Sequence, residues 1–80
     1  MKAVAFTPTA AKMLRKLSRD AARDLVAKVE RYAETGAGDV RALSGRPGLR
    51  LRSGDYRALF VETETAVTVL AVGHRRDVYE

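Results

Sequence analysis

The apolar residues of this chain follow a helical period in its first half and a strand period in its second half. Residues 2–6 (KAVAF) predict a short strand with Val4 and Phe6 on one face. A first helix follows, with apolar residues at helical spacing: Ala10, Met13, Leu14 and Leu17. A second helix continues to about Thr35, with its apolar positions at Ala22, Leu25, Val26, Val29 and Ala33.

Capping residues mark the ends of both predicted helices. Thr7 can cap the first helix, and Pro8 suits its first position because proline has no amide hydrogen to leave unpaired there. Ser18 can cap the second helix. Gly36 ends it, since glycine readily adopts the left-handed backbone found just past many helices. We therefore expect an αα-hairpin with a very short connection.

The second half of the chain predicts a loop followed by three strands. Residues 36–48 (GAGDVRALSGRPG) are interrupted by glycine and proline and are assigned to the loop. The expected strands are 49–53, 56–62 and 66–72, with a tight turn at 53–55 and Gly73 after the last strand. The order β-α-α-β-β-β indicates an α+β fold in which the helical hairpin covers one face of a small, mostly antiparallel sheet. Residues 1–80 are expected to form a single domain, with the first strand at an edge or beside the last strand.

One helical layer can cover only one face of this sheet. Strand 56–62 nevertheless carries apolar residues on both faces, with Ala58 and Phe60 on one face and Leu59 and Val61 on the other. An exposed apolar surface marks an interaction site. The uncovered face therefore predicts a bound partner.

Composition narrows the class of partner. The formal net charge is +5 and the sequence pI is about 10.1, so a polyanion is a natural ligand. The chain has no cysteine, which excludes disulfides and thiolate metal sites and fits a reducing compartment. No apolar run is long enough to span a membrane, and the N-terminal segment does not have the pattern of a signal peptide. We expect a cytoplasmic protein.

Arginines follow a strict alternation in the last third of the chain. Strand 49–53 places its two leucines on one face and Arg50 and Arg52 on the other. Arg57 lies on the neighbouring strand, and Arg75 and Arg76 follow the last strand. Guanidinium groups make fork-shaped hydrogen bonds to phosphate, so a meander that gathers them on one side predicts a phosphate site. The alternative is that these arginines only keep an exposed sheet face soluble.

His74 and Tyr79 are the candidates for proton transfer. His74 is the only histidine, and an imidazole titrates near pH 6.5, although a single surface histidine is often inert. Tyr79 can reach the basic residues only if Val78 holds the tail against the sheet. One histidine and scattered carboxylates do not give the spacing of a metal site, so we expect neither a metal nor a cofactor.

Two segments resemble a known protein family. LRLRSGDYRALF (49–60) and VLAVGHRRDVY (69–79) are similar to signature segments of the RelE/ParE superfamily, the toxins of bacterial type II toxin–antitoxin systems. The RelE-like branch is the closer match, because ParE gyrase poisons generally lack this set of basic residues and the terminal tyrosine. The resemblance implies a RelE-like microbial RNase fold.

The resemblance also implies an activity. A RelE-like toxin is a metal-independent, ribosome-dependent endoribonuclease (an mRNA interferase) that cleaves mRNA in the A site and so inhibits translation. A ribose 2′-OH attacks the adjacent phosphate. By position, Arg57 resembles the arginine that holds the phosphate, and Arg75 the one that supports the leaving 5′-oxygen. Arg50 takes the place of a catalytic strand residue, and Tyr79 that of the tail tyrosine at the cleavage point.

The chain departs from the family pattern on its first meander strand. Arg50 stands where lysine is frequent, and Gly48 stands where a second lysine is common. Because arginine keeps its proton at neutral pH, His74 or Tyr79 is left for proton transfer. Further basic residues are expected to bind RNA: Arg46, Arg52, Arg76, Lys12 and Lys16.

The resemblance implies a cognate antitoxin as partner, besides mRNA and the ribosome. An acidic, partly helical segment of the antitoxin would cover the bare sheet face and the arginines together, and such complexes can assemble into higher-order forms. Two alternative functions remain open at this stage: a ParE-like DNA gyrase poison, and a catalytically inactive binding module with the toxin fold.

Overall fold

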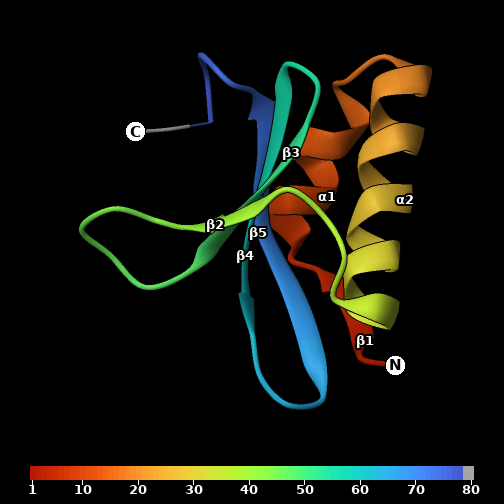
Figure 1. Ribbon diagram of the computed structural model, residues 1–80. Coiled ribbons are helices and arrows are strands. Elements are labelled where there is room, and N and C mark those ends of the chain that lie inside the picture. The colour runs from red at the N-terminus through yellow and green to blue at the C-terminus, as the bar shows by residue number, and fades with distance from the viewer. Residues whose placement is uncertain (79–80) are drawn as a thin grey trace.

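The computed structural model of the protein describes residues 1–78 and consists of a helical layer packed on a sheet (Figure 1). The two helices are α1 (Pro8–Arg15) and α2 (Arg19–Thr35). The strands are β1 (Ala3–Phe6), β2 (Val40–Ala42), β3 (Leu49–Ser53), β4 (Tyr56–Glu62) and β5 (Ala66–His74). They form one sheet in the order β1-β5-β4-β3-β2, in which only the β1–β5 pair is parallel. The predicted α+β architecture is confirmed, with β1 beside β5.

Both predicted helix starts have the expected capping hydrogen bonds. The hydroxyl of Thr7 accepts from the amide of Ala10 at 3.1 Å, and the hydroxyl of Ser18 accepts from the amide of Ala21 at 3.2 Å. Gly36 ends α2 with a positive φ of 76°, which a residue with a side chain adopts at a cost. These short-range interactions explain why the helix boundaries could be predicted from the sequence.

The main core lies between the helices and the sheet. Leu25 and Val29 of α2 are fully buried against Leu51, Phe60 and Val69 of the sheet. Val4 and Phe6 of β1 pack at its margin, as the alternation in residues 2–6 predicts. The burial of these side chains fixes which face of each strand is turned toward the helices, and therefore which residues lie on the opposite face.

Two strand boundaries differ from the predictions. Residues 36–48 are not all loop, because Val40–Ala42 form the edge strand β2 and pair with Leu49–Leu51 of β3. The last strand does not end before Gly73 but continues through His74. Gly73 pairs with Arg57 and Val78 packs beside it, so tertiary contacts hold this glycine in the sheet.

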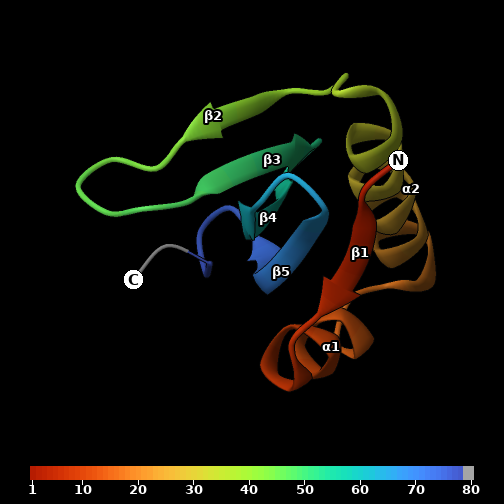
Figure 2. The same cartoon turned by 90° about the horizontal axis from the view of Figure 1, so that it is seen from below.

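The sheet face turned away from the helices is only partly bare. The β2–β3 loop and the segment after β5 both rise on this side (Figure 2). Leu59 is only 5% exposed, whereas Val61 and Leu70 are 38% and 42% exposed. A pocket of about 380 Å³ lies here and is lined by Leu43, Arg46, Pro47, Leu59, Leu70, Ala71 and Val78. The expectation of a fully uncovered face was therefore wrong for Leu59 and right for Val61.

Candidate functional site

Three of the predicted arginines share the face of the sheet turned away from the helices. Arg52 and Arg57 are directly paired across β3 and β4, and paired residues point to the same side of a sheet. Arg50 lies two residues earlier on β3 and is paired with Leu59. The neighbouring row, Leu51 and Ala58, is buried toward the helices. The structure thus brings Arg50, Arg52 and Arg57 to one face.

A fourth arginine lies on the same face and was missed in the sequence. Arg41 of β2 is paired with Arg50 and is exposed. The signal was present, because Val40, Arg41 and Ala42 alternate between apolar and charged positions, but it was too short to distinguish from a loop. We refer to Arg41, Arg50, Arg52 and Arg57 as the arginine face.

The side chain of Arg57 is held tightly by the turn between β3 and β4. Arg57 is 9% exposed, and its Nη1 donates to the carbonyl oxygens of Gly54 at 2.8 Å and Tyr56 at 2.9 Å. The Nε of Arg52 donates to the same Gly54 oxygen at 3.4 Å. These bonds fix two guanidinium groups around one carbonyl before any ligand arrives.

The segment that carries Arg75 and Arg76 docks beside this turn. The amide of Arg75 donates to the carbonyl of Asp55 at 2.8 Å, which joins the end of β5 to the β3–β4 turn. Val78 is 5% exposed, and its amide donates to the carbonyl of His74 at 3.1 Å. The expectation that Val78 is held against the sheet is confirmed. Both Arg75 and Arg76 are exposed next to the turn that positions Arg57.

His74 is not brought to the arginine face. It is paired with Tyr56, which is paired with Ser53, and these three residues form a row turned toward the helices. The Nζ of Lys28 on α2 donates to the hydroxyl of Ser53 at 3.1 Å, which fixes the direction of that row. The backbone amide of Arg76 donates to Nδ1 of His74 at 3.2 Å. His74 therefore has a structural contact on the opposite side of the sheet from Arg57.

The remaining predicted residues are spread over the surface. Lys12 and Lys16 are exposed at α1, in the helical layer and not beside the arginine face. Arg46 is exposed in the β2–β3 loop, where it lines the apolar pocket next to Leu59. Tyr79 lies outside the described residues.

The electrostatics of the arginine face favour an anion. Within residues 1–78, carboxylates form ion pairs with Lys2 and Arg23 but with none of Arg52, Arg57 and Arg75. Clustered guanidinium groups without carboxylate partners create a positive potential that attracts phosphate. The same part of the chain places no group of three histidine, aspartate or glutamate side chains where they could hold a metal ion. Neither described helix is long and apolar enough to cross a membrane.

Solved structures similar to this chain are toxins of one kind. The archaeal RelE–RelB complex of Pyrococcus horikoshii OT3 contains a chain with a TM-score of 0.77 and 20% identity, covering 96% of this chain and 98% of that one. The RelBE2 complex of Mycobacterium tuberculosis gives 0.64 and 28%, covering 92% and 98%. The intact RelBE complex of Escherichia coli gives 0.71 and 24%, covering 92% and 96%. No curated protein matches the sequence.

The fold and the arginine face define a small toxin of the RelE/ParE superfamily, as the two signature segments indicate. The model of a family described as the ParE toxin of the type II toxin–antitoxin system parDE matches residues 4–79. The chain belongs to this family and is a toxin of a type II toxin–antitoxin system.

Proposed function

We propose that this toxin is a metal-independent endoribonuclease that cleaves mRNA in the ribosomal A site and so inhibits translation. The observation that carries the proposal is the fixed pair of guanidinium groups at Gly54, with Arg75 docked beside them. Cleavage by 2′-OH attack builds negative charge on the phosphoryl oxygens. Donors that are already in place stabilise this charge without having to reorganise.

Each arginine has a distinct part in the proposed reaction. Arg57 binds the phosphoryl oxygens, because its Nη1 is anchored to two carbonyl groups and its charge is fixed in position. Arg75 supports the leaving 5′-oxygen from the adjoining turn, and Arg50 contacts the substrate from β3. Arginine cannot accept the 2′-OH proton. Since His74 faces the other side of the sheet, we assign proton transfer and substrate orientation to Tyr79.

The partner of the toxin would be a cognate antitoxin. The similar structures from Pyrococcus horikoshii and Escherichia coli are complexes of RelE with RelB. We propose that an acidic, partly helical antitoxin segment lies across the arginine face and inserts apolar side chains into the pocket beside Leu59 and Leu70. One segment would then block substrate and cover the exposed Val61 and Leu70.

A second candidate function is poisoning of DNA gyrase. The observation in its favour is that the family model matching residues 4–79 carries the ParE description. In that case the arginine face would serve binding, without phosphodiester chemistry. A toxin fold that has lost both activities would act only as a binding module.

An in vitro translation reaction separates these functions. The endoribonuclease proposal expects the purified toxin to stop translation, with new mRNA ends that toeprinting maps to A-site codons. A parallel supercoiling assay tests gyrase. Intact mRNA together with trapped double-strand breaks would overturn the proposal in favour of a gyrase poison. Intact mRNA and active gyrase would leave the binding module.

A further inference from the structure

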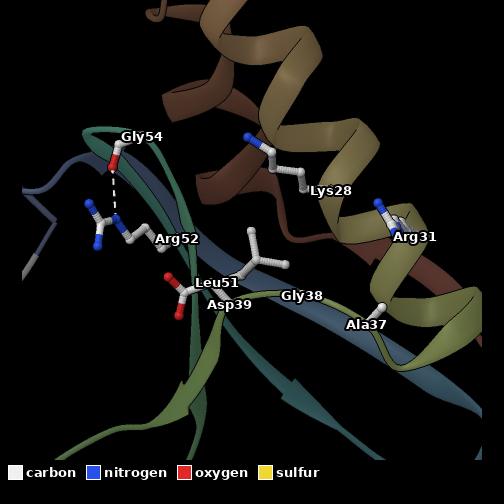
Figure 3. A pocket seen from close by; sticks show the side chains of 8 residues that line it. All are labelled: Lys28, Arg31, Ala37, Gly38, Asp39, Leu51, Arg52 and Gly54. Atoms are coloured by element: carbon white, nitrogen blue, oxygen red, sulfur yellow. Dashed lines mark hydrogen bonds between the residues drawn. The ribbon is translucent and has the colours of Figure 1, made fainter.

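A second basic site lies on the helix side of the turn that holds Arg57. It is a cleft of about 410 Å³ between α2 and the edge of β3 (Figure 3). Its lining consists of Lys28, Arg31, Ala37, Gly38, Asp39, Leu51, Arg52 and Gly54. We propose that this cleft binds a backbone phosphate of single-stranded RNA, on the stretch that flanks the cleavage point.

The path of the backbone creates the cleft. Residues 37–39 cross from the end of α2 to the sheet, and β2 begins only at Val40, so no strand covers the edge of β3 beyond this point. The carbonyl of Asp39 closes this edge by accepting from the amide of Arg52 at 2.9 Å. Leu51 lies at the centre of the lining, between the helix and the edge of the strand (Figure 3). The volume is in the range that accommodates a nucleotide-sized ligand.

The charges of the lining favour an anion. Lys28 and Arg31 come from α2 and Arg52 from β3, whereas Asp39 is the one carboxylate in the lining. Neither ion pair within residues 1–78 includes Lys28, Arg31 or Arg52. The hydrogen bond of Lys28 goes to the neutral hydroxyl of Ser53, which leaves its charge uncompensated. Cations gathered in a concave site raise the local concentration of anions more than the same charges do on a convex surface.

One residue links this cleft to the arginine face. Arg52 lines the cleft, and its Nε shares the carbonyl oxygen of Gly54 with Nη1 of Arg57. A strand with one phosphate at Arg57 can therefore continue around the 53–55 turn and place a neighbouring phosphate near Lys28 and Arg31. This inference rests on the proposed function in that RNA is taken as the substrate.

The test measures binding of RNA that cannot be cut. A fluorescent single-stranded oligonucleotide with 2′-O-methyl groups at every position is titrated with toxin at several salt concentrations. Each lost contact with a phosphate of a single strand lowers the slope of log K against log salt by about 0.7. The double variant Lys28→Gln and Arg31→Gln is expected to lower it by about 1.4, twice that value.

A matched double variant controls for net charge. Arg15→Gln and Arg19→Gln remove two exposed cations elsewhere on the helices and are expected to leave the slope unchanged. Equal losses in both double variants would overturn the cleft as a site and indicate diffuse attraction. An unchanged slope in the Lys28 and Arg31 variant, or no binding by the wild-type protein, would overturn it too. If the toxin leaves mRNA intact in translation, the endoribonuclease proposal fails, but the binding measurement still decides on the cleft.

Discussion

The imidazole of His74 stands edge-on to the ring of Tyr56, with ring centroids 5.7 Å apart and the ring planes at 82°. Edge-to-face packing is a favourable arrangement of two rings. Arg57, one position along β4 from Tyr56, points to the opposite face of the sheet. The single histidine of the toxin therefore supports the end of the sheet and does not face the phosphate site.

The first prediction concerns this histidine. His74→Gln should keep the pH dependence of cleavage, because the imidazole lies on the wrong face to exchange a proton with substrate. It should lower the free energy of unfolding by about 0.5–1.5 kcal/mol through loss of the ring contact. Single-turnover cleavage across neutral pH and a denaturant titration measure the two effects. Tyr56→Phe retains the ring and serves as the control. Loss of a rate limb near the ordinary pKa of histidine would return His74 to the catalytic set.

The second prediction concerns Arg57. Arg57→Ala should slow cleavage roughly 10²–10³-fold, because one donor to the charged transition state is lost. Arg57→Lys keeps the charge but cannot reproduce the two bonds to the carbonyls of Gly54 and Tyr56, and we expect only partial activity.

Stability has to be measured beside the activity of these variants. The two lost hydrogen bonds contribute about 0.5–1.5 kcal/mol each, so thermal unfolding is followed for each protein. Arg23→Ala, at an exposed position on α2, is the control and should retain full activity. Full toxicity of a folded Arg57→Ala protein would remove Arg57 from the mechanism.

Local signals account for most of the fold that the sequence could predict. Caps at Thr7 and Ser18 act within one turn of helix, and the alternation of residues 49–53 requires only the pleat of a strand. β2 escaped prediction because three residues have little strand preference of their own. Their pairing with Leu49–Leu51 depends on a hairpin that closes only in the folded protein.

The same distinction applies to the site. Alternation was enough to place Arg50 and Arg52 on one face, and the tight turn placed Arg57 beside them. His74 could not be placed, because the face of a strand residue depends on strand length and β5 runs through Gly73. Lys28 and Arg31 look like ordinary solvated helix residues in the sequence. They line a cleft only because residues 37–39 pass around the edge of β3.

The third prediction concerns pH and stability. The Oε2 of Glu62 accepts from Nζ of Lys2 at 2.6 Å, and its Oε1 accepts from the hydroxyl of Tyr32. These two hydrogen bonds, first that of Lys2 and then that of Tyr32, hold the pKa of Glu62 below its ordinary value of 4.5. The unfolded chain therefore binds the proton more readily than the folded one. The stabilisation is present above pH 4.5 and is lost as pH falls through the folded pKa.

Thermal unfolding between neutral and acid pH measures this loss. Glu62→Gln should flatten the acid limb of the melting temperature, and Glu64→Gln, at an exposed position nearby, should not. At high pH the sign reverses. The hydrogen bond to Glu62, burial and the charge of Glu62 raise the pKa of Tyr32 from 10.0 to about 12, so its stabilisation is lost as pH rises through that range. An acid limb that survives in Glu62→Gln would contradict the assignment.

The fourth prediction concerns Gly48, where relatives commonly carry lysine. Gly48 has a φ of 119°, and a Cβ there would lie 3.1 Å from Cδ1 of Leu43 and 3.3 Å from the carbonyl oxygen of Phe60. Gly48→Lys should therefore destabilise the fold by about 1–3 kcal/mol and should not increase cleavage. A denaturant titration measures the loss. Gly45→Lys is a useful comparison, because that glycine also has a positive φ but has open space around its Cα. A stable Gly48→Lys variant with faster cleavage would show that the backbone adapts.

The last prediction concerns the antitoxin surface. Leu70 is 42% exposed at the rim of the apolar pocket, although it lies in the middle of β5. Burial of one such side chain in a complex contributes about 1.5–3 kcal/mol. Leu70→Glu should therefore weaken antitoxin binding at least about tenfold, and repulsion by an acidic antitoxin segment should add to this loss.

Isothermal titration of the toxin with its antitoxin measures the loss. Ala27→Glu adds the same charge at an exposed position on α2 and should bind the antitoxin normally. The Leu70→Glu toxin should still cleave mRNA, because Leu70 is not part of the arginine face, and cells that carry both proteins should lose the protection that the antitoxin gives. Unchanged affinity in Leu70→Glu would move the antitoxin away from this face. It would leave the exposure of Leu70 and Val61 to be explained by a different partner.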